Sequence, residues 1–151
     1  MKKAALKIKN ATVEHIDNIL NIEKVSFTIP WTESVFRNEL EKLSWSKTFM
    51  VKYYDIYAGY LLYWIIDSDC HLQKIAVLPE YRKMNIAGFM ISHLFKTLKT
   101  NQISRILLEY REHNPAAASL YDKMGFSKLD IRKKYYRDTG ENAIVMEKLL
   151  M

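Results

Sequence analysis

The stretch from Glu80 to Met90 has the pattern of a phosphate-binding turn. It reads E-Y-R-K-M-N-I-A-G-F-M and follows the apolar run I-A-V-L-P, which indicates a strand that ends in a basic turn and opens directly into a helix. Such a turn leaves backbone N–H groups free at the helix N-terminus, where the helix dipole favours an anion. Gly88 comes late in the turn, and Asn85 stands where a second glycine would be expected. The alternative is an ordinary solvated surface turn.

Two further side chains have the chemistry of a proton acceptor and a proton donor. Glu109 lies near the end of a short apolar strand, where a carboxylate facing a cleft would be partly desolvated. Tyr121 follows 12 residues later, and a phenol with an ordinary pKa of about 10 can serve as a general acid. Residue type alone also fits a strand-edge glutamate paired with Arg111 or Arg105, and a tyrosine packed inside a helix.

Hydrophobic periodicity and turn residues predict the elements that would position these side chains. Strands are expected at 6–11, 48–54, 57–66, 70–77, 104–110, 126–132 and 142–149, and helices at 12–27, 32–43, 86–98 and 114–125. Thr12, Thr32 and Asn114 are expected to cap helices, and Gly125 is expected to end the last one in a left-handed conformation. The order β-α-α-β-β-β-α-β-α-β-β predicts an α/β (α+β) domain built around one mixed sheet.

The composition indicates one globular domain over residues 1–151. Hydrophobic residues make up 49% and charged residues 26% of the chain, which is ordinary for a soluble protein. The longest apolar run, residues 57–66, is too short to span a membrane. The single cysteine, Cys70, cannot form an intramolecular disulfide; it is either a nucleophile or a small buried hydrophobic residue. We therefore expect a cytoplasmic protein with no membrane partner.

The net charge of +6 fits either solubility or an anionic partner, such as nucleic acid or a phosphorylated cofactor. No block of Lys and Arg reaches five residues, so nucleic acid is not expected as the primary ligand. No histidine lies at ligand spacing from another histidine or from the cysteine, so no metal is expected. The sequence carries no signal for an oligomeric state.

Several separate segments resemble the GCN5-related N-acetyltransferase (GNAT) superfamily. Residues 82–87, R-K-M-N-I-A, are similar to its cofactor motif Gln/Arg-x-x-Gly-x-Gly/Ala. Further segments resemble its branch of ribosomal-protein-alanine N-acetyltransferases (RimI-like enzymes). They are F-T-I-P-W-T-E (27–33), L-L-E-Y-R-E-H-N-P-A-A-A-S-L-Y-D-K-M-G-F (107–126), I-R-K-K-Y-Y (131–136) and E-N-A-I-V-M (141–146). The resemblance covers almost the whole chain and is strongest over residues 72–146.

This resemblance implies the GNAT acyl-CoA N-acyltransferase fold, with acetyl-CoA as cosubstrate and no metal. Amides of the basic turn would bind the pyrophosphate, and backbone groups of the preceding strand would flank the thioester, with an N–H near Val77 polarising the acetyl carbonyl. Asn114 would contact the CoA arm as well as cap its helix. The implied cofactor-binding residues are Ile75, Ala76, Val77, Arg82, Lys83, Met84, Asn85, Ile86, Ala87, Gly88 and Asn114.

Asn85 departs from the first glycine of the motif. Asparagine is the non-glycine residue that best tolerates a left-handed backbone, so the turn is expected to keep its shape. Its side chain would nevertheless crowd a phosphate and weaken the binding of the cofactor.

The resemblance also implies direct transfer of the acetyl group to an amine, without an acyl-enzyme and without a role for Cys70. Glu109 matches the glutamate that accepts the proton of the amine, and Tyr121 matches the tyrosine that protonates the departing thiolate. The acceptor would be the N-terminal alanine of small-subunit ribosomal protein eighteen, which would enter between residues 28–32 and 134–141. Substrate binding is expected, as an alternative to a place in the core, for Trp31, Tyr135 and Tyr136.

Three other functions fit the same residues. The first is the same chemistry on another amine, namely a lysine side chain, a polyamine or an antibiotic. The second is a non-catalytic acyl-CoA binding module, which Asn85 would support and the presence of Glu109 and Tyr121 opposes. The third is an RNA-associated basic domain, whose affinity for RNA would fall steeply with salt.

Overall fold

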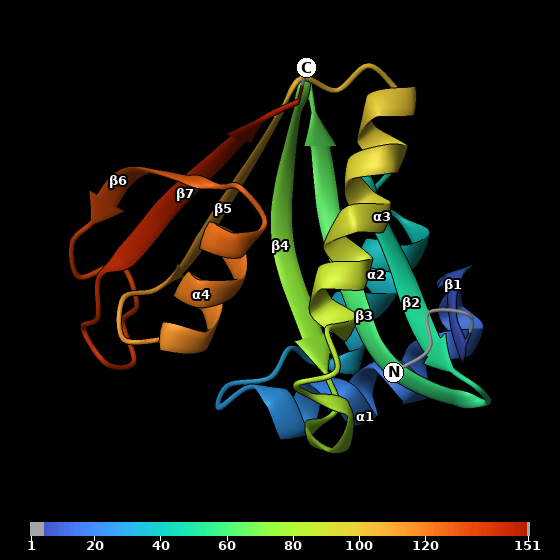
Figure 1. Ribbon diagram of the computed structural model, residues 1–151. Helices are drawn as coiled ribbons and strands as arrows, with labels where there is room; N and C mark the ends of the chain where they lie inside the picture. Colours follow the sequence, from blue (N-terminus) through green and yellow to red (C-terminus); the bar gives the residue numbers. More distant parts are fainter. Residues whose placement is uncertain (1–4, 151) are drawn as a thin grey trace.

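The computed structural model describes residues 5–150, which form a seven-stranded mixed sheet covered by helices (Figure 1). The strands are β1 (Leu6–Asn10), β2 (Ser46–Tyr53), β3 (Ile56–Ile66), β4 (Asp69–Val77), β5 (Arg105–Arg111), β6 (Ser127–Arg132) and β7 (Ala143–Leu149). The α-helices are α1 (Ile16–Ser26), α2 (Glu33–Glu41), α3 (Ile86–Thr100) and α4 (Pro115–Lys123), with short 3-10 turns at Val13–His15 and Pro79–Tyr81. This order confirms the predicted fold class.

The predicted caps are present where the sequence placed them. Thr32 accepts a hydrogen bond from the Val35 amide at 3.4 Å, and Asn114 accepts one from the Ala117 amide at 3.1 Å. Gly125 has a φ of +89°, the left-handed conformation expected after the last helix. Some details differ from the prediction. Thr12 caps the 3-10 turn that leads into α1, and α2 ends at Glu41, before the predicted end at 43.

The strands lie in the order β1-β2-β3-β4-β5-β7-β6, and only β4 and β5 are parallel neighbours. Their pairing covers four positions, from Asp69 opposite Arg105 to Leu72 opposite Leu108. Beyond Leu72 the two strands diverge, as Figure 1 shows. We call the space between residues 73–77 of β4 and residues 109–111 of β5 the β4–β5 gap.

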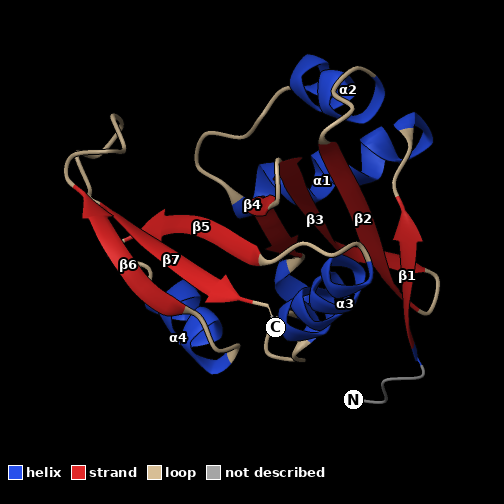
Figure 2. Cartoon of the chain, turned by 90° about the horizontal axis from the view of Figure 1, so that it is seen from above, coloured by secondary structure: helices blue, strands red, loops and turns tan. Residues whose placement is uncertain are grey.

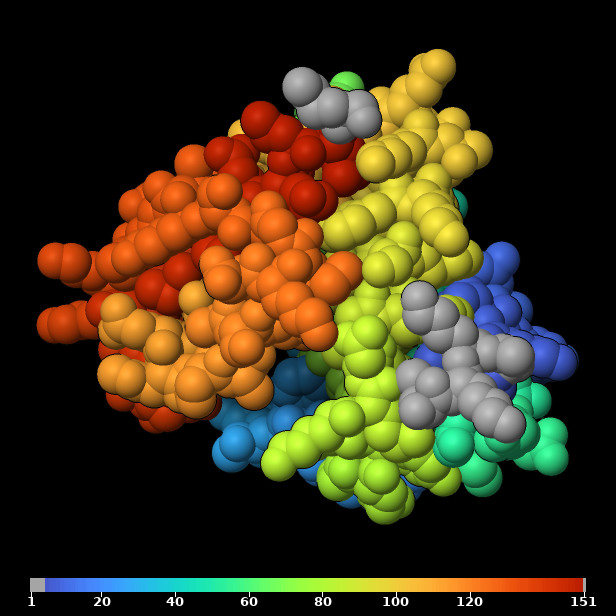
Figure 3. All heavy atoms as spheres, viewed as in Figure 1, coloured from blue at the N-terminus to red at the C-terminus, as the bar shows by residue number. Residues whose placement is uncertain are grey.

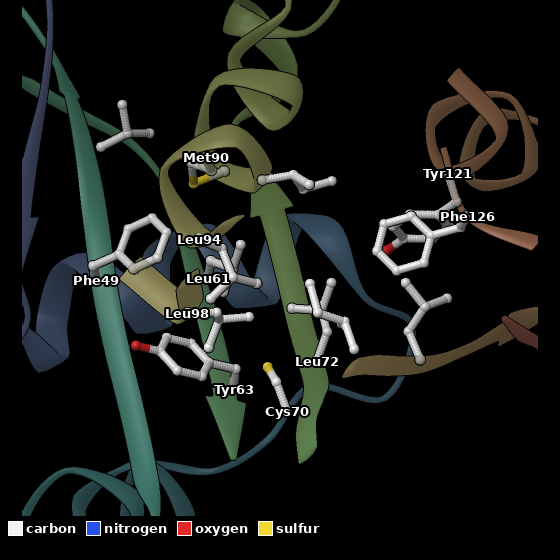
Figure 4. Close-up of a cluster of buried hydrophobic side chains, with 14 of the residues drawn as sticks. Phe49, Leu61, Tyr63, Cys70, Leu72, Met90, Leu94, Leu98, Tyr121 and Phe126 are labelled. Atoms are coloured by element: carbon white, nitrogen blue, oxygen red, sulfur yellow. The ribbon is translucent and has the colours of Figure 1, made fainter. Parts of the chain in front are cut away.

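Each face of the sheet carries its own hydrophobic layer. Figure 2 shows α1 and α2 on one face and α3 and α4 on the other. The larger core lies under α3 and α4 (Figure 4). It contains side chains from β3 and β4 as well as from β5 and α4, among them Leu61, Leu72, Met90, Leu108 and Tyr121. This shared core stabilises the sheet where the β4–β5 ladder stops.

Candidate active site

The β4 side of the gap presents backbone groups that have no partner strand. The Leu78 amide donates to the Ala58 carbonyl at 2.8 Å, so these two residues form a hydrogen-bonded antiparallel pair. Hydrogen-bonded pairs alternate with non-hydrogen-bonded ones, so Ala76 is bonded to β3, while the backbone groups of Ile75 and Val77 point into the gap. Of the three residues predicted to flank a thioester, Ile75 and Val77 therefore have the right orientation, and Ala76 does not.

The turn before α3 has the left-handed backbone that an anion-binding turn needs. Lys83 and Asn85 have φ values of +63° and +60°, so Asn85 does adopt the conformation expected of it. The helix starts at Ile86, and its first turn contains no acidic residue, which leaves the positive end of the helix dipole uncompensated.

Arg82 uses its guanidinium to fix this turn to the rest of the fold. Its Nε donates to the carbonyl of Val77 at 2.9 Å, and its Nη2 lies 3.5 Å from the hydroxyl of Ser26 at the end of α1. The carbonyl of Val77 is thus occupied, and the N–H of Val77 is the group directed into the gap. The charge of Arg82 was expected beside a phosphate, but its side chain is bound to β4 and α1.

Asn85 folds its side chain over the first turn of α3. A Cβ atom added at Gly88 would lie 2.3 Å from the Oδ1 atom of Asn85, so the two positions depend on each other. Both residues line a hollow of about 270 Å³ that continues past Lys96 to Lys123. The side chain of Asn85 therefore lies at the N-terminus of α3, where it was expected to crowd a phosphate.

Glu109 lies on the β5 side of the gap. Successive side chains of a strand point to opposite faces. Leu108 lies in the core beneath α3 and α4, so Glu109 faces the α1 and α2 side, where its carboxylate is 3.8 Å from the Nε of Arg132. The sequence alternative named Arg111 and Arg105 as partners, and this was wrong: those arginines pair elsewhere.

Tyr121 reaches the same region from the opposite face. It is buried in α4, and its ring packs at 5.6 Å from Phe126 and 5.8 Å from Tyr110. Burial raises the pKa of Tyr121, and the neighbouring hydroxyls of Tyr136 and Tyr110 raise it further, so the side chain keeps its proton at neutral pH. Figure 4 shows this side chain beside Phe126, extending from α4 toward β4.

The loop between β6 and β7 brings two tyrosines to the side of Glu109. Their rings lie 5.1 Å apart, and 46% of Tyr135 is exposed, so Tyr135 is not a core residue. Burial raises the pKa of Tyr136; the nearby guanidinium of Arg111 opposes this, and the carboxylate of Glu109 adds to it. Arg111 holds the loop by stacking 4.1 Å from the Tyr136 ring and by donating to Asp138 at 2.9 Å.

The loop between α1 and α2 (residues 27–32) lies over a buried ion pair that sequence reasoning missed. Glu23 is fully buried, accepts a hydrogen bond from the Trp31 amide at 2.8 Å, and is bonded to the side chains of Lys74 and Tyr60. Burial lowers the pKa of Lys74, and the carboxylate of Glu23 opposes this. The signal was present: Glu23 lies on the apolar stripe of its helix, one turn after Ile19.

The gap is open at the surface. Figure 3 shows a hollow between the orange residues of α4 and the yellow-green residues that precede α3. Cys70 is buried away from this opening, and burial raises the pKa of its thiol to about 12. Among residues 5–150 there is no cluster of side chains that could hold a metal ion, and no helix long and apolar enough to cross a membrane.

Comparisons with known proteins agree with this arrangement. Residues 16–126 match the family model described as the acetyltransferase (GNAT) family. The putative [ribosomal protein bS18]-alanine N-acetyltransferase of Bacillus subtilis is 34% identical, over 95% of each chain. The [ribosomal protein bS18]-alanine N-acetyltransferase of Escherichia coli is 30% identical, over 83% of this chain and 85% of that one.

Two solved structures share the fold. The ribosomal-protein-S18-alanine N-acetyltransferase of Escherichia coli superposes with a TM-score of 0.89 at 25% identity, covering 96% of this chain and 94% of that one. The Naa50 protein of Arabidopsis thaliana, in complex with the bisubstrate analogue CoA-Ac-MVNAL, superposes with a TM-score of 0.82 at 18% identity, covering 95% and 98% of the two chains.

Proposed function

This chain belongs to the acetyltransferase (GNAT) family and is an N-acetyltransferase, and from that premise we propose that it acetylates the N-terminal alanine of ribosomal protein bS18 in the cytoplasm. The relatives from Bacillus subtilis and Escherichia coli carry that activity in their names. The structural observation that supports acetyl transfer most directly is the placement of Glu109 and Tyr121 on opposite faces of the sheet beside the β4–β5 gap.

Enzymes of this family use acetyl-CoA, and the residues around the gap fit that molecule. The amides at the start of α3, with no acidic residue in the first turn, suit a pyrophosphate. Lys96 and Lys123, which line the adjoining hollow, are placed to attract the charge of a nucleotide. The N–H of Val77 would donate to an acyl oxygen beside β4, the geometry that stabilises developing negative charge.

Acetyl-CoA supplies an acetyl group held in a thioester. Its transfer to a protonated amine removes two protons from the nitrogen, one before attack and one as the amide forms, and adds one proton to the sulfur of CoA. A peptide α-amine has a pKa of about 7.7–8.0, so at neutral pH most of it carries a proton that must leave before attack. Glu109, which faces the α1 and α2 side, accepts that proton. The phenol of Tyr121 is protonated at neutral pH, and burial raises its pKa further above the ordinary value. Its hydroxyl donates this proton to the sulfur from the other face, and the second proton that the nitrogen loses returns to the phenolate through solvent.

We place the acceptor side between two loops, namely residues 27–32 between α1 and α2, called the acceptor loop, and the loop between β6 and β7. Trp31 lies on the acceptor loop, and Tyr135 and Tyr136 lie on the loop between β6 and β7. Aromatic side chains supply large contact areas with few rotatable bonds, which suits the clamping of a peptide backbone. An N-terminus entering there would bring its amine to the face of the sheet that holds Glu109.

Mass spectrometry of an Ala-Arg peptide incubated with acetyl-CoA tests this proposal. The expected product carries one acetyl group on the α-amine, and the same peptide with a blocked N-terminus and an added lysine is expected to remain unmodified. Acetylation of the lysine, of spermidine or of an aminoglycoside instead would assign the enzyme to another amine. Binding of acetyl-CoA without transfer to any of these amines would contradict the catalytic roles of Glu109 and Tyr121.

A further inference from the structure

One buried carboxylate joins four parts of the chain. Glu23, in α1, accepts hydrogen bonds from the hydroxyl of Tyr60 in β3, the ammonium of Lys74 in β4, and the amide of Trp31 in the acceptor loop. Both carboxylate oxygens are used, and the side chain is fully buried. The bond from Trp31, at 2.8 Å, fastens the backbone of the loop, near its α2 end, to the layer beneath it.

Aromatic rings near both ends of the acceptor loop cover Lys74, the partner of Glu23 in the ion pair. The Nζ atom of Lys74 lies 4.1 Å from the centre of the Phe27 ring and 4.3 Å from that of Trp31. A cation over the face of an aromatic ring is attracted to it, and more strongly where water is excluded. The loop is therefore held by one hydrogen bond from its backbone and by two rings stacked on one ammonium group.

Stability alone does not explain a charge pair at this place. Replacing a buried ion pair with apolar residues of similar volume is often neutral or stabilising, because removing both charges from water is costly. What an apolar pair could not supply is an acceptor for the Trp31 amide. Lys74 also directly precedes Ile75, whose backbone points into the gap, so the same contact ties the acceptor loop to the strand beside the acyl donor.

We propose that Glu23 and Lys74 are positioning residues, which fix the acceptor loop relative to β4 and thereby set the distance between the acceptor amine and the acyl group. This inference rests on the proposed function, because it assumes that the acceptor peptide binds along this loop. Neither side chain touches the reacting atoms. Small displacements between reacting groups cost large factors in rate, which is the reason for a rigid attachment.

Two matched double variants separate positioning from folding. Glu23→Gln with Lys74→Met removes both charges but keeps an amide oxygen that can accept from Trp31, while the amide nitrogen can donate to Tyr60. Glu23→Leu with Lys74→Met removes both charges and the acceptor as well. Neither double variant leaves an unpaired buried charge, so both are expected to fold, which thermal denaturation checks.

The two variants should differ in the kinetic constants for the peptide and not in the KM for acetyl-CoA. The kcat/KM for the Ala-Arg peptide should be about tenfold lower in the Leu variant than in the Gln variant, the factor that corresponds to loss of the hydrogen bond from the Trp31 amide. The KM for acetyl-CoA should be the same in both. Equal values of kcat/KM for the peptide in the two folded variants would overturn the inference.

Hydrogen exchange of the Trp31 amide gives a readout that does not depend on activity. We expect faster exchange in the Leu variant than in the Gln variant, and equal exchange would show that Glu23 does not hold the loop. A wild-type enzyme that acetylates no peptide would instead refute the proposed function, while the exchange comparison would still decide whether the attachment exists.

Discussion

Glu109 and Tyr121 lie on opposite faces of the sheet, which suits two side chains that handle different protons in one reaction. The alternation of side chains along β5 determines this: Tyr110 packs against Tyr121 on the α4 side, so its neighbour Glu109 must face the other way. The two groups can therefore be removed one at a time, and each removal should change a different proton transfer.

Glu109→Gln should lower kcat by at least about 100-fold, the lower end of what a general base contributes. The amide keeps the size of the side chain but cannot accept the proton of the amine. The affinity for acetyl-CoA, measured by calorimetry, should not change, because Glu109 faces away from the α3 and α4 side. Glu147→Gln, in β7 beside Arg105, is the matched control and should keep full activity; unchanged kinetics for Glu109→Gln would remove its assigned role.

Tyr121→Phe should slow turnover by about 100-fold without unfolding the protein, since the ring is retained and only the proton donor is lost. Circular dichroism should give the same melting temperature within a few degrees. Tyr63 is also buried, and burial raises its pKa to about 12. Tyr63→Phe is therefore the control for removal of a buried hydroxyl, and an equal loss of activity in both variants would argue against a specific role for Tyr121.

Cys70→Ala should leave kcat and KM unchanged. Burial raises the pKa of the Cys70 thiol to about 12, so almost none of it is thiolate at neutral pH, and a thiol is a poor nucleophile. The free energy of unfolding should fall by about 1 kcal/mol because a buried atom is lost. Loss of activity in a variant that remains folded would indicate a covalent acyl-enzyme, which direct transfer does not need.

At the scale of elements, the turn into α3 is built around one pair of residues. Asn85 has a left-handed backbone, and its side chain occupies the space above Gly88. Glycine accepts this backbone more readily than asparagine does, so Asn85→Gly should leave the turn intact. It should also tighten the binding of CoA, because the crowding side chain is removed. An unchanged Kd would show that the Asn85 side chain does not crowd the cofactor.

A double-mutant cycle tests whether the two positions are coupled. Gly88→Ala alone should weaken CoA binding, because its Cβ would meet the Oδ1 atom of Asn85 at 2.3 Å and displace that flexible side chain at the helix N-terminus. The same substitution in the Asn85→Gly protein should be nearly harmless. The coupling free energy should be at least about 1 kcal/mol, as for other side chains in contact, and additive effects would show that Gly88 is needed for another reason.

Elements with strong local signals were predictable from the sequence, and contacts between distant segments were not. Thr32, Asn114 and Gly125 mark helix ends by their own chemistry, and the structure has them in those roles. The divergence of β4 from β5 depends on where a parallel partner stops, for which no local pattern exists. The pairing of Glu23 with Lys74 spans 51 residues, and the partner of Glu109 proved to be Arg132, on a different strand.

The site residues also divide into those with a local sequence signal and those whose orientation depends on distant contacts. The left-handed Asn85 could be predicted, because asparagine tolerates that backbone and the turn demanded it. The direction of the Arg82 side chain could not, since it depends on Ser26 and Val77, which reach it only in the folded chain. Ala76 was placed in the gap by resemblance, whereas the register of β3 against β4 turns its backbone the other way.

At the scale of the whole molecule, the sheet consists of two parts that share few backbone contacts. β1 to β4 form one part and β5 to β7 the other, joined at four paired positions and by the core under α3 and α4. A ligand that fills the β4–β5 gap would touch both parts. Its binding should therefore stabilise the fold as a whole and not one loop.

Saturation with CoA should raise the melting temperature of the protein. At a concentration about 100 times its Kd, a ligand that binds only the folded state adds about 2.7 kcal/mol, which corresponds to roughly 5–10 °C for a chain of this size. Differential scanning fluorimetry would measure this, with pantetheine as the matched control, because it lacks the phosphates that the α3 turn would bind. Glu109→Gln should show the same shift as the wild type, since that carboxylate faces the acceptor side. A melting temperature insensitive to CoA would mean that the gap is not the binding site, and the roles assigned to Val77, Glu109 and Tyr121 would all fail with it.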